Sequence, residues 1–173
     1  MGCSSLQGTG DKGYIEGDGV VVQIPADKRD APVELTGKSL TGEPLDLADL
    51  RGEVVVVNTW WSGCAPCRTE MPMLVKADEQ LKQAAFFGIN IRDASPEQGL
   101  AFERRLDVNY PSLYEPGGKA LLAFSGKVSL NSIPTTAVLD TEGRVAAVIS
   151  GPIPSKLTLT EVVEDVVAEQ RDG

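Results

Sequence analysis

Apolar residues along the chain occur in short continuous blocks and in longer segments with helical spacing. The block Val54–Trp60 is rich in β-branched residues, which is typical of a strand buried on both faces of a sheet. Within Ser155–Gln170, four valines recur at a helical period, so this segment is predicted to be a helix with one apolar stripe. These two segments mark the centre and the end of the predicted domain.

The same two patterns predict the other elements of the chain. Strands are expected at Val20–Ile24, Val33–Leu35, Glu43–Leu47, Ala85–Ile91, Pro111–Tyr114, Thr135–Asp140 and Arg144–Ser150. Helices are expected from Ala65 to about Ala84, at Ser95–Leu106 and at Lys119–Phe124. The Thr-Glu-Gly sequence between the last two strands is typical of a hairpin turn.

This order of elements predicts an α/β fold with a central mixed sheet and helices on both faces. Val33–Leu35 and Glu43–Leu47 are expected to pair as a small N-terminal β-hairpin extension. We expect a single domain over residues 20–173. Residues 1–19 are dominated by Gly, Ser, Thr and Asp, so they are predicted to form a flexible tether.

Cys3 lies in this tether and resembles the lipid-modified cysteine of a bacterial lipoprotein, which follows a small residue and precedes a polar linker. A lipid on Cys3 would anchor the protein to the outer face of the bacterial cell membrane, an extracytoplasmic location. The alternative is an incidental thiol. Because no stretch reaches the roughly 20 apolar residues that span a bilayer, membrane attachment is expected only through Cys3.

The composition excludes several classes of function. The 16 Lys and Arg residues against 25 Asp and Glu residues give a net charge of −9, which disfavours nucleic-acid binding. The chain has no histidine, so catalysis by an imidazole base and metal sites that use imidazole are excluded. Its three cysteines are too few for a four-thiolate metal cage. We therefore expect no metal and no organic cofactor.

Cys64 and Cys67 are separated by two residues, at the junction between the predicted buried strand and the long helix. At this spacing the two thiols can form a disulfide across the first helical turn. Cys64 lies at the helix N-terminus, where free N–H groups and the helix dipole favour a thiolate. Cys67 lies one turn further in and should be less exposed. This arrangement favours a redox pair over half of a zinc site, with Cys64 attacking and Cys67 resolving.

The chain from about residue 25 to residue 170 resembles the thioredoxin superfamily, in particular its extracytoplasmic TlpA/ResA-like branch. The segments that carry the resemblance are Val54–Trp60, Cys64–Arg68, Glu70–Pro72, Tyr110–Lys119 and Ser132–Thr136. The resemblance implies a thioredoxin-like fold. It also implies that the bond before Pro134 is cis, that Ile133 and Pro134 present backbone to a substrate chain, and that Pro72 kinks its helix.

The resemblance assigns further roles around the cysteines. Glu70 is expected to tune their acidity, and the alternative is a solvated glutamate near the helix start. Asn58 occupies the position of the buried acid of cytoplasmic thioredoxins and cannot accept a proton, so any base role passes to Glu70 or to water. Pro66 and Trp61 are expected to contact the substrate. Gly63 departs from the family pattern, which has a bulky residue directly before the first cysteine, and Trp61 is the candidate to supply the missing bulk.

The resemblance implies a thiol–disulfide oxidoreductase that reduces protein disulfides, with apocytochrome c as the best-known substrate of the branch. The dithiol would then be restored by a membrane thiol donor of the CcdA/DsbD type. Three alternatives remain open at this point: a disulfide oxidase or isomerase of the same fold, a thiol peroxidase, and a redox-inert or metal-carrying binding module.

Overall fold

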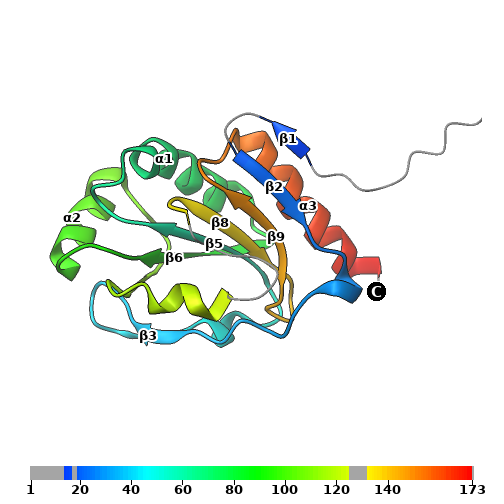
Figure 1. The fold of residues 1–173 in the computed structure, drawn as a ribbon, viewed down its shortest axis with the longest axis horizontal. Helices are drawn as coiled ribbons and strands as arrows, with labels where there is room; N and C mark the ends of the chain where they lie inside the picture. The colour runs from blue at the N-terminus through cyan, green and yellow to red at the C-terminus, as the bar shows by residue number, and fades with distance from the viewer. Residues whose placement is uncertain (1–13, 17–18, 125–131, 173) are drawn as a thin grey trace, which may run out of the picture.

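The computed structural model describes residues 14–16, 19–124 and 132–172, and a seven-stranded mixed sheet forms its centre (Figure 1). The strands of this sheet are β1 (Tyr14–Glu16), β2 (Gly19–Gln23), β5 (Val54–Trp60), β6 (Ala84–Asn90), β7 (Ser112–Tyr114), β8 (Thr135–Leu139) and β9 (Val145–Ser150). Their order across the sheet is β1-β2-β9-β8-β5-β6-β7. A separate two-stranded sheet pairs β3 (Thr36–Lys38) with β4 (Pro44–Asp46).

The helices connect these strands. The α-helices are α1 (Ala65–Gln80), α2 (Pro96–Leu106) and α3 (Lys156–Asp172), and the 3-10 helices are η1 (Ala26–Lys28), η2 (Leu47–Leu50) and η3 (Lys119–Phe124). β5, β6 and β7 run parallel, so α1 and α2 lie in the crossovers between them. β8 is antiparallel to both β5 and β9, and its pairing with β9 is the predicted hairpin.

The sheet separates two hydrophobic cores. Alternate residues of β5 belong to different cores, Val54 and Val56 to one and Val55 and Val57 to the other. The first core includes side chains of all three α-helices, and the second includes side chains of η2 and η3. Helical segments therefore cover both faces of a mixed sheet, which confirms the predicted α/β architecture with a central mixed sheet.

Several predicted elements differ from the structure at their ends. The long helix ends at Gln80 rather than near Ala84, because the chain turns there and enters β6 at Ala84. The hairpin extension is present, but its first strand is β3 (Thr36–Lys38) and not Val33–Leu35. Val33 and Leu35 instead bury their side chains in the second core, so their apolar alternation reflects packing and not strand pairing.

The expected tether overlaps the sheet at one place. Tyr14–Glu16, which the sequence analysis included in the tether, form β1 and pair with β2. Cys3 lies outside the described residues, so its lipidation and the membrane anchor stay predictions. Within the described part of the chain, every helix is too short or too polar to cross a bilayer.

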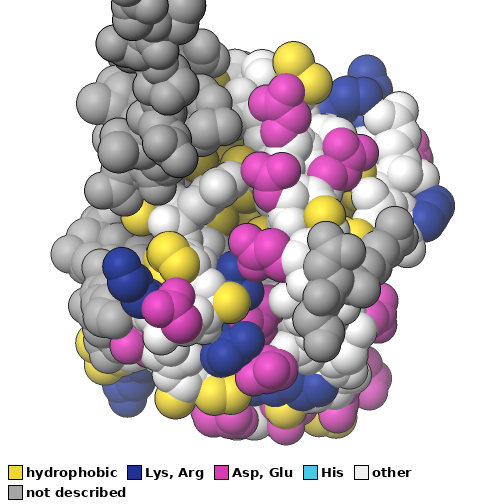
Figure 2. Space-filling model, turned by 90° about the vertical axis from the view of Figure 1, so that its right-hand side faces the viewer, with side chains coloured by type: hydrophobic (Ala, Val, Ile, Leu, Met, Phe, Trp, Pro, Cys, Tyr) yellow, Lys and Arg dark blue, Asp and Glu magenta, His cyan; other side chains and the backbone are white. Residues whose placement is uncertain are grey.

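Acidic side chains are spread over the face of the molecule on which β2 and α3 lie (Figure 2). Lys and Arg side chains lie among them, so the described residues of this face do not form a continuous basic stripe of the kind that binds nucleic-acid backbones. This distribution agrees with the net charge of −9.

Candidate active site around the Cys64–Cys67 disulfide

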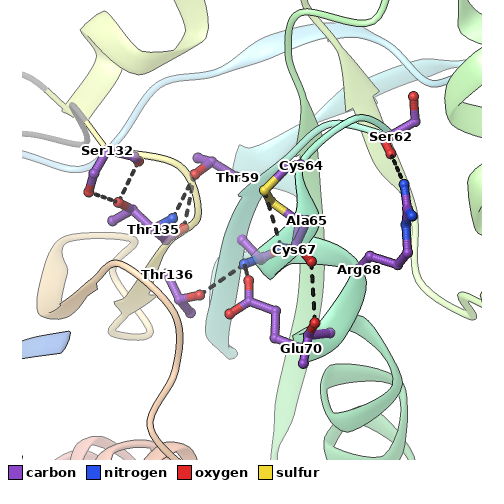
Figure 3. The surroundings of a disulfide bond; sticks show 12 residues. Thr59, Ser62, Cys64, Ala65, Cys67, Arg68, Glu70, Ser132, Thr135 and Thr136 are labelled. Carbon is purple, nitrogen blue, oxygen red and sulfur yellow. Dashed lines mark hydrogen bonds between the residues drawn. A yellow bond between two sulfur atoms is a disulfide. The ribbon is translucent and has the colours of Figure 1, made fainter. Parts of the chain in front are cut away.

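Cys64 and Cys67 form a disulfide across the first turn of α1, with their Cα atoms 5.2 Å apart (Figure 3). Cys64 is the N-cap of α1, and its Sγ accepts a hydrogen bond of 3.1 Å from the backbone N–H of Cys67. Pro66 lies in the first helical turn. Backbone N–H groups there have no acceptor within the helix, so the missing N–H of proline costs no hydrogen bond. A donor aimed at Cys64 Sγ would also stabilise a thiolate on that atom.

The two sulfur-bearing residues differ in exposure. Cys64 is 6% exposed and Cys67 is fully buried, while Ala65 and Pro66 between them are exposed. An incoming thiol or disulfide can therefore reach Cys64 more easily than Cys67. This is the order of exposure that the spacing predicts for an attacking and a resolving cysteine.

The turn that leads into Cys64 is held by a residue that the sequence analysis missed. The carboxylate of Asp93, three residues after the end of β6, accepts hydrogen bonds from the backbone N–H of Ser62 at 3.1 and 3.2 Å and from its hydroxyl at 2.6 Å. The N–H of Cys64 closes the turn by donating to the carbonyl of Trp61 at 3.1 Å. The sequence contained one indication of this contact. Asp93 follows β6 and the cysteine turn follows β5, and the carboxyl ends of neighbouring parallel strands meet at one edge of a sheet.

Trp60 and Trp61 have different environments, as expected from their position at the end of β5. Trp60 is fully buried and stacks on Phe102 of α2, with ring centroids 4.9 Å apart. Trp61 is partly exposed, and its indole lies over Gly63. An ideal Cβ on Gly63 would be 2.1 Å from Cζ3 of that ring. Trp61 thus occupies the space beside Cys64 that a side chain on Gly63 would need.

Glu70 is 5% exposed and projects from α1 into a set of polar groups (Figure 3). Its Oε1 accepts a hydrogen bond of 3.1 Å from Asn58 Nδ2, and its Oε2 accepts one of 3.1 Å from the backbone N–H of Ile153. Asn58 also donates to the hydroxyl of Thr136 at 3.0 Å. Burial outweighs these two donors and raises the pKa of Glu70 to about 7. This carboxyl can therefore change protonation state near neutral pH.

The peptide bond between Ile133 and Pro134 is cis, as the resemblance implies. Ser132 and Thr135, which flank this bond, lie beside the disulfide (Figure 3). The hydroxyl of Thr59 accepts from the N–H of Thr135 at 3.0 Å and donates to its carbonyl at 3.1 Å, so β5 fixes the start of β8. The carbonyl of Pro134 accepts from Gly151 at 3.0 Å. The end of β5, the start of β8 and the residue after β9 are thus tied together by hydrogen bonds.

The chain is similar to one protein family and to several individual thiol–disulfide proteins. The profile of the family described as Redoxin matches residues 23–166. Thiol:disulfide interchange protein HelX of Rhodobacter capsulatus is 32% identical over 169 residues, which cover 90% of each chain. Thiol-disulfide oxidoreductase ResA of Bacillus cereus is 28% identical over 113 residues, 65% of this chain and 63% of that protein. The crystal structure of a secreted thiol-disulfide isomerase from Corynebacterium glutamicum superposes with a TM-score of 0.80 at 29% identity, covering 95% of this chain and 98% of that one.

Proposed function

From the premise that this chain belongs to the Redoxin family and is a thiol–disulfide oxidoreductase, we propose that it reduces disulfide bonds in other proteins. The observation that carries the proposal is the unequal pair at the start of α1. Cys64 caps the helix and receives an N–H bond at its sulfur, whereas Cys67 is fully buried. Such a pair attacks a substrate with one sulfur and releases it with the other.

The proposed reaction has two exchange steps. The Cys64 thiolate attacks one sulfur of a substrate disulfide, a bond forms between these two sulfurs, and the other substrate sulfur leaves as a thiolate that takes up a proton. Cys67 then loses its proton and attacks Cys64 Sγ, so that the Cys64–Cys67 bond forms and the second substrate thiol leaves. Two electrons pass from the pair to the substrate. We assign Glu70 as the group that tunes the acidity of the pair, because its carboxyl titrates near neutral pH.

Substrate docking is assigned to the surface around Cys64. We propose that Ile133, directly before the cis bond to Pro134, offers its backbone to the substrate, because Pro134 has no N–H and its carbonyl already accepts from Gly151. We propose that an extended segment of the substrate forms hydrogen bonds with this backbone, as an added strand does at the edge of a sheet. Trp61 and Pro66 expose apolar surface on either side of Cys64 in sequence. The ring of Trp61 fills the space next to Cys64 that the family's bulky residue would fill at position 63.

The proposed direction of the reaction rests on the two residues between the cysteines, which add no further stabilisation of the thiolate beyond the helix N-terminus. Ala65 and Pro66 bring neither a histidine nor a charge between the cysteines, so the pair lacks the feature that makes a dithiol strongly oxidising. The resemblance to the TlpA/ResA-like branch points to the haem-attachment cysteines of apocytochrome c as substrate. We propose a membrane thiol donor of the CcdA/DsbD type as reductant.

The proposed location is extracytoplasmic, with Cys3 as the lipid anchor. Support for the location comes from the similar Corynebacterium glutamicum protein, which is secreted, and support for the anchor comes from the sequence around Cys3. Labelling of cells with radioactive palmitate should mark the wild-type protein and not the Cys3→Ala variant. Equal labelling of both proteins, or of neither, would contradict the anchor.

The reduction potential of the Cys64–Cys67 pair tests the direction. Equilibration against dithiothreitol or glutathione buffers should give a value near or below about −250 mV, in the range of thioredoxin. A value of about −120 to −180 mV, in the range of DsbA and protein disulfide isomerase, would show an oxidase or isomerase instead. If the wild-type pair formed no disulfide in these buffers, exchange itself would be excluded.

A further inference from the structure

The carboxylate of Asp93 is buried and bonded chiefly to one residue of the active-site turn. Asp93 is 2% exposed, and three of its donor contacts come from the N–H and hydroxyl of Ser62. A fourth comes from Asn90 Nδ2 at 2.7 Å. Burying a carboxylate is unfavourable unless several donors replace its water, so these contacts hold Ser62 against Asp93.

Asp93 is itself fixed by the sheet and not by the turn that it holds. Asn90 is the last residue of β6, and the hydroxyl of Tyr114 in β7 donates to the carbonyl of Asp93 at 3.1 Å. Arg92, directly before Asp93, has a φ of 68°, a conformation that a non-glycine residue adopts only when its surroundings require it. The carboxylate is therefore a rigid anchor for Ser62.

Ser62 lies two residues before Cys64, inside the turn closed by the bond from Cys64 N–H to Trp61 O. The carbonyl of Ser62 also accepts from the guanidinium of Arg68 at 3.3 Å. In the oxidised protein the disulfide ties Cys64 to Cys67 whatever the turn does. In the dithiol that tie is absent, so the backbone of the turn determines where Cys64 Sγ lies relative to Cys67.

We propose that Asp93 is a positioning residue for thiol–disulfide exchange, which acts through Ser62 to hold Cys64 where it can bond Cys67. Holding the two sulfurs together in the dithiol removes an ordering cost from formation of the disulfide. This ordering stabilises the disulfide relative to the dithiol, so Asp93 makes the pair more reducing. The inference rests on the proposed exchange at Cys64 and Cys67.

The test compares the redox equilibrium of the wild-type protein with that of Asp93→Asn. The asparagine has nearly the same shape but loses the charge and one acceptor oxygen. We expect the equilibrium with dithiothreitol to move about tenfold toward the dithiol, which corresponds to a potential about 30 mV less negative. Unfolding in urea should show that the variant destabilises the oxidised protein more than the reduced protein. A purely structural role would destabilise both forms equally and leave the potential unchanged, and that result would overturn the proposal.

Ser62 and Asp140 provide matched controls. Ser62→Ala removes only the hydroxyl donor and should shift the equilibrium in the same direction by about threefold, while Ser62→Thr should restore it. Asp140 is a fully buried carboxylate just after β8, at the end of that strand away from Pro134. Asp140→Asn should lower stability without changing the potential.

The Ser62 variants decide the question if Asp93→Asn does not fold. A shift in Ser62→Ala that Ser62→Thr reverses supports the proposal, and identical potentials in both variants and the wild type contradict it. Failure of the proposed exchange would appear differently, as the absence of a disulfide in the wild-type protein itself.

Discussion

The side-chain amide of Asn58 lies 3.1 Å from the carboxylate of Glu70, in the interior of the protein where β5 passes α1. Glu70 also accepts from the N–H of Ile153, and Asn58 also donates to Thr136. The carboxyl is therefore held by two donors but is almost completely removed from water. Because burial has the larger effect, the pKa of Glu70 is raised to about 7.

Glu70→Gln should change the pH dependence of stability. Burial raises the pKa of Glu70 from 4.5 to about 7 in the folded protein, so its contribution to stability is fully present below pH 4.5 and is lost as the pH rises through 7. Relative to Glu70→Gln, the oxidised wild-type protein should lose up to about 3 kcal/mol of unfolding free energy over this range. Urea unfolding from pH 4 to pH 8 measures the difference. The control is Glu79→Gln, an exposed position of the same helix.

The same variant tests the assigned role of Glu70 at the cysteines. If Glu70 tunes their acidity, the rate of alkylation of Cys64 in the reduced protein should follow a different pH profile in Glu70→Gln. Glu79→Gln should keep the wild-type profile. Superimposable profiles for all three proteins would dismiss that role, whatever the stability measurements show.

Gly63→Ala should destabilise the protein through Trp61. The added Cβ would lie 2.1 Å from the indole ring, so the ring has to leave its position over residue 63. Overpacking in a core costs about 1–3 kcal/mol, and the cost here should be at or below the lower end because Trp61 is partly exposed and its ring can rotate away. In a protein that already carries Trp61→Ala, the ring is absent, so Gly63→Ala should lower the unfolding free energy much less. Urea unfolding of the two single variants and the double variant gives the coupling, and additive effects would show that the ring is not the cause.

Cys67→Ser should trap substrate on Cys64. Without the resolving sulfur, the mixed disulfide formed in the first exchange step cannot be released within the chain. An oxidised peptide that carries two haem-attachment cysteines should therefore accumulate as a covalent adduct, seen as an added mass in non-reducing mass spectrometry. Cys64→Ser is the matched control and should form little adduct, because Cys67 is fully buried. Cys3 is replaced by Ala in both variants so that its thiol does not react. Equal amounts of adduct in the two variants would contradict the assigned roles, and more adduct in Cys64→Ser would reverse them.

Thr59→Val should loosen the start of β8 next to Pro134. Valine keeps the shape of threonine but removes the hydroxyl, which leaves the buried N–H of Thr135 without the acceptor it has at 3.0 Å. Losing the partner of a buried donor costs about 1–3 kcal/mol. We expect lower stability in urea and slower reduction of the peptide disulfide. Thr36→Val, at an exposed position of β3, should change neither quantity.

The sequence by itself determined the elements whose signals are local. The β-branched run at Val54–Trp60, the cap and spacing of the two cysteines, and the apolar stripe of α3 each depend on neighbouring residues, and all three agree with the structure. Where an apolar pattern had two explanations, local information was insufficient. Val33 and Leu35 alternate like a strand but pack against the sheet without joining a strand.

Only the tertiary structure decided which distant residues meet around Cys64. The pairing of Asp93 with Ser62, the position of Asn58 against Glu70 and the bonds from Thr59 to Thr135 join segments 12 to 76 residues apart. Such contacts depend on the order and register of strands and on where each helix crosses the sheet. No single segment encodes that order, because it results from burying two hydrophobic cores at once. The sequence therefore identifies the two sulfurs of the disulfide, and the fold determines which polar groups surround them.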